Sequence, residues 1–174
     1  MNKPLILVVE DDPSVRTLIT TTLKTNDYRY VVAHNGSAAI METTSHNPEI
    51  ILLDLGLPDM DGVQVIQTVR SWSNVPIIVI SARSEDNDKI KALDAGADDY
   101  LTKPFSVEEL LARLRVTQRR LSLMTAEMFT AKSVFVNGKL KVDYAGGCAY
   151  LDENELHLTP IEYKLLCLLS KNVG

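Results

Sequence analysis

Acidic residues occupy the positions where two short apolar runs of this sequence end. Asp54 follows the run 50–53, and Glu10 and Asp11 follow an earlier run of the same kind. Carboxylates that end neighbouring buried strands meet at one edge of a sheet, where their negative charges repel one another. A hard divalent cation, which takes only oxygen ligands, relieves such repulsion. Together with Lys103, these acids predict a site that binds Mg²⁺ and accepts a phosphoryl group.

The acidic residues fit different roles in that chemistry. Asp54 fits the nucleophile, because an attacking carboxylate has to be ionised and held in line with the phosphoryl donor. Asp11 fits a direct Mg²⁺ ligand, and Glu10 fits either a ligand that acts through water or a base-like neighbour. The backbone carbonyl of Gly56, two residues past the nucleophile, would complete the protein's share of the coordination.

Two further side chains complete the predicted site. Lys103 is expected to pair with Asp54 before the reaction and with a phosphoryl oxygen afterwards, and the Ser81 hydroxyl is expected to donate to the same oxygen. A single aspartate at a strand end is more often a helix cap or a solvated loop residue. The prediction therefore depends on the whole set and on its order along the chain.

The first 121 residues alternate apolar runs with amphipathic stretches, the pattern of consecutive βα units. Strands are expected at 5–9, 30–33, 50–54, 77–81 and 100–101, and helices at 13–25, 36–48, 62–72, 85–95 and 106–121. This order predicts an α/β fold with a five-stranded, doubly wound parallel sheet of the flavodoxin-like type. Ligands of such sheets bind beyond the carboxyl ends of the strands, at the switch point between the first and third strands.

The composition changes after residue 121. Residues 122–131 show no clear periodicity and are interpreted as a linker. Short β runs then predict a small antiparallel sheet, with Asn137-Gly138 as a hairpin turn and strands that include 156–158, followed by one helix from Pro160. The leucines of that helix, at positions 165, 166, 168 and 169, are expected to face a core. Without the rest of a winged helix, part of this stripe is expected to be exposed and available for self-association. A sheet and one helix make a poor independent core, so 132–174 is interpreted as an incomplete domain.

Bulk composition excludes several classes of protein. The net charge of −5 argues against a protein that coats nucleic acid. Cys148 and Cys167 are too few for a disulfide framework, and no apolar stretch is long enough to span a membrane. No secretory signal is visible, so we expect a cytoplasmic protein with reduced thiols. The eight glycines include no Gly-x-Gly-x-x-Gly pattern, which argues against a dinucleotide-binding module.

Residues 1–121 resemble a two-component response-regulator receiver domain, which has the CheY-like fold. The motifs that carry this resemblance are Val-Val-Glu-Asp-Asp at 8–12, Leu-Asp-Leu-Gly-Leu-Pro-Asp-Met-Asp-Gly at 53–62, Ile-Ser-Ala-Arg at 80–83 and Asp-Asp-Tyr-Leu-Thr-Lys-Pro-Phe at 98–105. Residues 132–174 resemble the start of an OmpR/PhoB-type winged-helix effector through the segment 158–166. Residues 54–59, Trp72-Ser73, Val75-Pro76 and 81–83 are similar to those of the Kdp potassium-uptake regulators.

The resemblance implies a role for each matching residue of the site. Asp54 would accept a phosphoryl group from the phosphohistidine of a sensor kinase. Asp11 and the Gly56 carbonyl would bind Mg²⁺ with help from Glu10. The resemblance also implies that Lys103, which would precede a cis peptide bond, coordinates the phosphoryl group together with Ser81.

The resemblance further implies a conformational switch. Tyr100 would turn inward as Ser81 moves toward the phosphate. Serine at position 81 replaces the threonine that is commoner in the family, so a hydroxyl is kept and a methyl is lost. Gly56 supplies only backbone where many relatives have a side chain, so easier access of water to the acyl phosphate is predicted from that side, unless Arg83 blocks it.

Charged residues along the fourth helix, the fifth strand and the fifth helix match a symmetric dimer interface of the family. A solvated surface is the ordinary reading of such charges. The resemblance implies three pairs across the twofold axis, namely Lys89 with Glu109, Asp99 with Arg113, and Asp98 with Arg120. Exposed pairs of this kind are individually weak, so they would specify register more than they hold the dimer together.

The chain from residue 134 onward has four lysines, no arginine and five acids, which gives a net charge of −1. No basic helix is present to enter a major groove. We therefore expect the complete protein to be a transcription factor and this fragment not to bind DNA specifically. Two alternatives are a stand-alone receiver without DNA binding and a phosphatase with an aspartyl nucleophile. The phosphatase usually needs a second acid two residues after the nucleophile, where this chain has Gly56.

Overall fold

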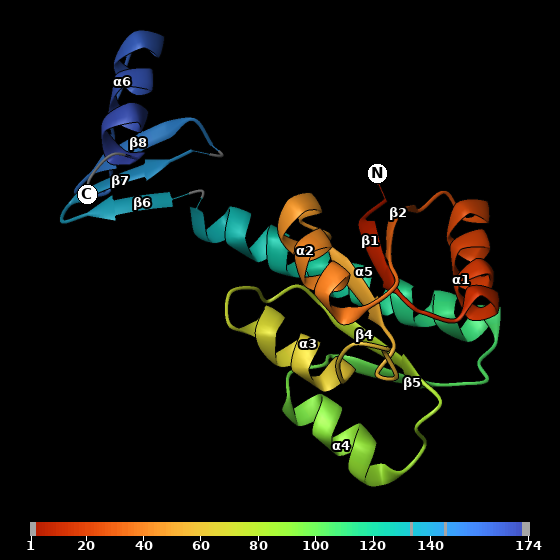
Figure 1. Ribbon diagram of the computed structural model, residues 1–174. Helices are drawn as coiled ribbons and strands as arrows, with labels where there is room; N and C mark the ends of the chain where they lie inside the picture. Colours follow the sequence, from red (N-terminus) through yellow and green to blue (C-terminus); the bar gives the residue numbers. More distant parts are fainter. Residues whose placement is uncertain (1–2, 133, 145, 172–174) are drawn as a thin grey trace. The chain divides into compact units, whose positions relative to one another are not determined.

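The computed structural model describes residues 3–132, 134–144 and 146–171 (Figure 1). The chain divides into two compact units, one that ends at Gln118 and one that begins at Arg119. Among the described residues, no helix combines the length and the apolar character that a membrane span requires. Each unit is described separately below.

The first unit is built on a parallel sheet with the strand order β2-β1-β3-β4-β5. Its strands are β1 (Leu5–Val9), β2 (Arg29–Ala33), β3 (Ile50–Leu53), β4 (Ile77–Ser81) and β5 (Asp99–Thr102). In the register, Val9 of β1 lies opposite Leu53 of β3, so these two strands end level with each other. The predicted flavodoxin-like sheet is confirmed, and its switch point lies between β1 and β3.

Five helices connect or follow these strands. They are α1 (Pro13–Thr25), α2 (Gly36–His46), α3 (Gly62–Arg70), α4 (Asp86–Asp94) and α5 (Val107–Lys132). Local sequence explains where α1 starts: Asp12 accepts hydrogen bonds from the amides of Ser14 and Val15 at 2.7 and 3.0 Å, and Pro13 needs no partner at the first helical position. The same kind of cap begins α5, where the Glu109 amide donates to Ser106 Oγ at 3.1 Å.

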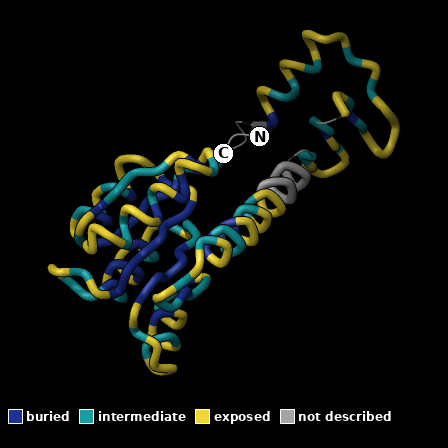
Figure 2. The backbone as a smooth tube through the Cα atoms, turned by 90° about the vertical axis from the view of Figure 1, so that its right-hand side faces the viewer, coloured by how far each residue is buried: buried dark blue, intermediate teal, exposed yellow. Residues whose placement is uncertain are grey.

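The three central strands, β1, β3 and β4, are buried on both faces and belong to the dark interior of this unit in Figure 2, whereas the outer strands β2 and β5 are partly exposed. Alternate residues such as Leu53 and Val79 pack with Ala39 of α2, Val65 of α3 and Ala92 of α4. The residues between them point to the opposite face, because side chains alternate along a strand. A parallel sheet covered on both faces explains why its strands are continuous apolar runs rather than alternating ones.

Helix α5 differs from its prediction. It was expected to end near residue 121, but it continues to Lys132 and includes the whole stretch 122–131 that was interpreted as a linker. The sequence 122–132 contains neither glycine nor proline and is rich in alanine, methionine and other residues that tolerate a helix. The lack of apolar periodicity in this stretch therefore did not mark the end of the helix.

The second unit holds an antiparallel sheet in the order β6-β7-β8-β9, followed by α6 (Pro160–Lys171). Its strands are β6 (Val134–Asn137), β7 (Leu140–Asp143), β8 (Cys148–Leu151) and β9 (Asn154–Glu155). The expected strand 156–158 does not form. Asp152 and Glu153 have positive φ angles of 49° and 65° and make a tight turn, after which Asn154 and Glu155 pair with Leu151 and Tyr150. The Leu156 amide still donates to the Ala149 carbonyl at 2.7 Å, but the strand ends at Glu155.

Three of the four leucines of the stripe expected on α6 are exposed, in line with the expectation that part of this stripe is left uncovered. Leu165, Leu168 and Leu169 are 56%, 60% and 59% exposed, while Leu166 is partly buried. One antiparallel sheet cannot cover every side of a helix. The start of α6 is nevertheless well defined, because the Thr159 amide donates to Glu162 Oε2 at 2.7 Å and closes a capping box.

Candidate functional site

Three carboxylates gather where β1 and β3 end. One oxygen each from Glu10, Asp11 and Asp54 lies within 4.8 Å of the other two. Glu10 follows β1 and Asp54 follows β3, and the Asp54 amide donates to the Val9 carbonyl at 2.9 Å, which fixes the two strand ends side by side. The structure therefore brings together the acids that the sequence assigned to one site.

Lys103 provides the positive charge of this site. Its Nζ lies 2.7 Å from Asp54 Oδ2 and 2.8 Å from Glu10 Oε2. Burial alone would lower the pKa of the ammonium, but the contacts with Asp54 and Glu10 outweigh it and the pKa is raised. The peptide bond between Lys103 and Pro104 is cis, as the resemblance implied. Lys103 is therefore a fixed cation aimed at the carboxylate of Asp54.

The carboxylate of Glu10 lies in an environment that disfavours its negative charge. Its side chain is 1% exposed, and burial together with the nearby Asp54 raises the pKa of the carboxyl group. Glu10 Oε2 has no hydrogen bond among the described residues, so its contact with Lys103 is an ion pair without hydrogen-bond alignment. A buried oxygen of this kind next to two further carboxylates fits a hard divalent cation such as Mg²⁺.

Gly56 leaves the carboxylate of Asp54 open on one side. The Gly56 amide donates to Asp54 Oδ1 at 3.2 Å. A Cβ atom at position 56 would lie 3.9 Å from both carboxylate oxygens of Asp54, in ordinary contact, and no closer obstacle is present. A side chain at this position would therefore begin in contact with the carboxylate of Asp54, which is itself 7% exposed.

Ser81, Arg83 and Tyr100 form a connected group beside the acids. The Ser81 side chain is buried, and its Oγ accepts a hydrogen bond from the Arg83 amide at 3.2 Å. Tyr100 is partly buried and its hydroxyl donates to the Arg83 carbonyl at 2.7 Å. The sequence did not reveal that the Arg83 guanidinium is held by Asp61 at 2.8 Å, because only the fold brings these two loops together.

Four of the six residues assigned to the dimer face make ion pairs within one chain. Asp99 pairs with Arg113 at 3.0 Å, and Arg113 also approaches Glu109 at 3.6 Å. Asp98 is held elsewhere, by Arg70 at 2.9 Å, a contact that the sequence did not predict. The remaining two members lie on different helices, Lys89 on α4 and Arg120 on α5.

Apolar side chains on the same elements were missed by the sequence reasoning. Ile90 and Leu93 on α4, and Val116 on α5, are exposed large hydrophobic residues. An apolar residue at helical spacing predicts burial, so nothing in the sequence separated these from the core.

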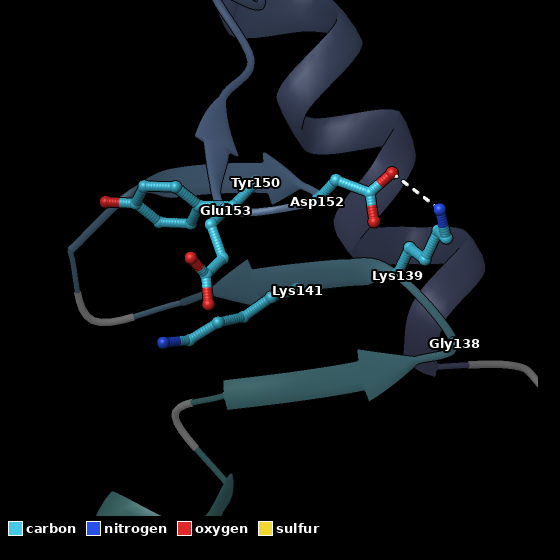
Figure 3. Close-up of a pocket in the computed structure, with 6 residues that line it drawn as sticks. All are labelled: Gly138, Lys139, Lys141, Tyr150, Asp152 and Glu153. Atoms are coloured by element: carbon cyan, nitrogen blue, oxygen red, sulfur yellow. Dashed lines mark hydrogen bonds and ion pairs between the residues drawn. The ribbon is translucent and has the colours of Figure 1, made fainter.

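The second unit has a hollow of about 540 Å³ on its sheet, lined by Gly138, Lys139, Lys141, Tyr150, Asp152 and Glu153 (Figure 3). Lys139 pairs with Asp152 at 2.9 Å, and the Lys141 ammonium lies 5.8 Å from the centre of the Tyr150 ring. Among the described residues, the only group of three acids close enough to share a metal ion is Glu10, Asp11 and Asp54, none of which lines this hollow. The candidate site for phosphoryl transfer is therefore the one at the end of β1 and β3.

Comparison with known proteins defines the class. Residues 6–115 match the family model described as the response regulator receiver domain, and the chain belongs to this family. It is 47% identical over 169 residues to the KDP operon transcriptional regulatory protein KdpE of Escherichia coli K12, covering 97% of this chain and 73% of that protein. A transcriptional regulatory protein KdpE from Staphylococcus aureus is 43% identical, with coverage of 97% and 71%.

Solved structures agree with this assignment. The receiver domain of the Francisella response regulator 1452 has a TM-score of 0.65 and 34% identity, covering 68% of this chain and 99% of that chain. DrrB, described as an OmpR/PhoB homolog from Thermotoga maritima, has a TM-score of 0.58 and 27% identity, covering 99% of this chain and 74% of that chain. The protein is thus a response regulator with a receiver domain, similar to the KdpE transcriptional regulators.

Proposed function

We propose that Asp54 accepts a phosphoryl group from the phosphohistidine of a sensor kinase. The observation that carries this proposal is the position of Lys103, whose ammonium contacts both Asp54 and Glu10 within 2.8 Å. An ammonium held there pairs with the carboxylate before attack and can follow a phosphoryl oxygen afterwards. The buried Ser81 hydroxyl, on the next strand, is the second group available to that oxygen.

We further propose that Mg²⁺ is the cofactor. Asp11, Asp54 and the Gly56 carbonyl would hold the ion, with Glu10 assisting. When bound, the ion supplies positive charge against the phosphoryl oxygens. The buried Glu10 oxygen, which contacts Lys103 without hydrogen-bond alignment, and the three adjacent carboxylates support this donor set, because one ammonium does not balance three negative charges.

The proposed switch runs through the loop after β4. Tyr100 and Ser81 both bind the backbone of Arg83, one through its carbonyl and one through its amide. A Ser81 hydroxyl that turns toward a phosphoryl group at Asp54 would pull on this loop and therefore on Tyr100. The population of the active arrangement would then rise because phosphate offers contacts that only this arrangement makes.

Phosphorylation is proposed to promote a homodimer through α4, β5 and α5. Exposed Ile90, Leu93 and Val116 would supply apolar area, and the charged residues of the face would set the register. In the monomer, Asp99 and Arg113 already pair within one chain. On dimerisation, Asp99 and Arg113 would give up this pair within one chain and form the same pair across the interface. The exchange would add little to the affinity of the dimer but would help to specify its register.

The complete protein is proposed to be a cytoplasmic transcription factor that acts on potassium-uptake genes. The similarity to proteins named as regulators of the KDP operon supports this assignment. Residues 132–174 are proposed to be the first part of an OmpR/PhoB-type winged-helix domain, after a receiver at 1–121 and a connecting segment at 122–131. This chain is proposed not to bind DNA specifically, since residues 134–174 carry four basic and five acidic residues.

Intact mass spectrometry after treatment with acetyl phosphate tests the function. Wild-type protein should gain the mass of one phosphoryl group with Mg²⁺ and none without it, and Asp54→Asn should gain none. A phosphatase with an aspartyl nucleophile would instead release many equivalents of product from a phosphomonoester. If the wild-type protein hydrolyses many equivalents of a phosphomonoester and Asp54→Asn does not, the function is that of a phosphatase and the proposed role as a regulator is wrong.

A further inference from the structure

The loop between β3 and α3 is docked on the start of α2 by Asp59. Asp59 Oδ1 accepts a hydrogen bond from the Gly36 amide at 2.7 Å. Asp59 Oδ2 accepts from the Ser37 amide at 2.9 Å and from the Ser37 hydroxyl at 2.8 Å. The amides of a first helical turn have no partner within the helix and carry partial positive charge, so a carboxylate is well placed there.

Helix α2 has a cap of its own, so Asp59 is not needed merely to begin it. The side chain of Asn35, which immediately precedes the helix, accepts from the Ala38 amide at 2.8 Å. Asn35 is local, whereas Asp59 reaches the same helix start from more than twenty residues further along the chain. The distinctive effect of Asp59 is therefore to hold the loop that carries it.

A second contact presses the same loop against the same helix. A Cβ atom added to Gly36 would lie 2.4 Å from Met60 Cγ and 2.6 Å from its sulfur. Met60 therefore occupies the space where any larger residue at position 36 would place its side chain. Residues 59 and 60 dock together, one through hydrogen bonds and one through close packing.

The docked tip and Gly56 belong to one closed loop. Gly56 and Asp61 form an isolated antiparallel β-bridge, and the Gly62 amide donates to the Leu55 carbonyl at 3.0 Å. These contacts join the first and last residues of the loop. Gly56 has no side chain to restrict it, and glycine has the widest backbone freedom of all residues. Its carbonyl direction therefore depends on how the rest of the loop is held.

We propose that Asp59 is a positioning residue, which docks this loop on α2 and so holds the Gly56 carbonyl where the divalent cation requires it. This inference rests on the proposed Mg²⁺ site. Outer residues that orient metal ligands typically change metal affinity by about 10–100-fold when they are removed. Removal of Asp59 would leave the backbone contacts that close the loop in place. The expected change in Mg²⁺ affinity is therefore near the low end of that range.

Two matched variants test the inference, because each removes one cap from the same helix. Asp59→Ala frees the loop and Asn35→Ala does not. Titration with Mg²⁺ alone, followed by amide NMR signals, should show affinity about tenfold weaker in Asp59→Ala and unchanged within twofold in Asn35→Ala. Without metal, the Gly56 amide signal should shift in the first variant and not in the second. Asp59→Asn, which keeps an oxygen acceptor, should fall between wild type and Asp59→Ala and serves if Asp59→Ala fails to fold.

The outcomes separate this inference from the proposed function. Equal loss of Mg²⁺ affinity in both variants would assign the effect to helix stability and overturn the positioning role. Unchanged affinity in Asp59→Ala, or in Asp59→Asn if only that variant folds, would overturn it as well. Failure of the wild-type protein to bind Mg²⁺ at millimolar concentration would instead remove the proposed metal site itself. At saturating Mg²⁺, the phosphorylation rate of Asp59→Ala should return to the wild-type value.

Discussion

Glu10→Gln should make the protein more stable at neutral pH in the absence of Mg²⁺. At an effective dielectric constant of 20, repulsion from Asp54 within 4.8 Å is about 3.5 kcal/mol, and attraction to Lys103 at 2.8 Å is about 6 kcal/mol. Burying the carboxylate opposes folding by several kcal/mol more. The raised pKa of Glu10 shows that the unfavourable effects of charge prevail. The expected gain is on the order of 1 kcal/mol.

The pH dependence of this gain has a definite sign. Between the unfolded pKa, near 4.5, and the raised folded pKa, folded wild type binds more protons than unfolded wild type. Wild type therefore loses stability as pH rises through that window, whereas the glutamine variant does not. The difference should be full at about pH 8 and absent at about pH 4.

Urea unfolding at both pH values measures this difference. Glu49→Gln is the matched control, because Glu49 pairs at 3.9 Å with Arg29 on an exposed surface and should change stability by less than about 0.5 kcal/mol. Added Mg²⁺ should stabilise wild type more than Glu10→Gln, since binding to the folded state adds to its stability. A glutamine variant that is less stable than wild type at pH 8 would refute the account of a strained, buried carboxylate.

Three further outcomes are expected. Gly56→Met should lengthen the lifetime of the phosphorylated form several-fold in a dephosphorylation time course, since its side chain would cover the Asp54 carboxylate; an unchanged lifetime would count against this. Arg113→Glu should weaken phosphorylation-driven dimerisation at least tenfold by sedimentation, because a like charge would face Asp99, and adding Asp99→Arg should restore it; unchanged sedimentation would remove the assigned face. Lys103→Gln should destabilise the fold by about 3 kcal/mol in urea, because Asp54 and Glu10 lose their cation; equal stability would show that the pair is solvated.

The site was predictable from sequence because its geometry follows from topology. Parallel strands that are neighbours in the sheet end at the same edge, so Glu10, Asp11 and Asp54 had to meet once β1 and β3 were adjacent. The same argument placed Ser81 and Lys103 beside them. Turn and cap residues, such as Asp12 and the Thr159–Glu162 pair, also gave the helix starts correctly, because caps act within one turn of the chain.

The errors arose where a residue's environment depends on distant parts of the fold. Periodicity reports which face of a helix is buried, so it could not detect the continuation of α5 to Lys132 or the exposure of Leu165. The contacts of Asp59 with α2 and of Arg83 with Asp61 join separate loops, and nothing in their local sequence pairs them. Such contacts become visible only when the loops above the sheet have been placed.

Chemical trapping of the phosphorylated residue tests the central claim most directly. Borohydride reduces an acyl phosphate on aspartate to homoserine, which peptide sequencing by mass spectrometry locates. After treatment with acetyl phosphate, homoserine should appear at position 54, only when Mg²⁺ is present. Homoserine at any other position, or its formation at position 54 without a divalent cation, would contradict the account.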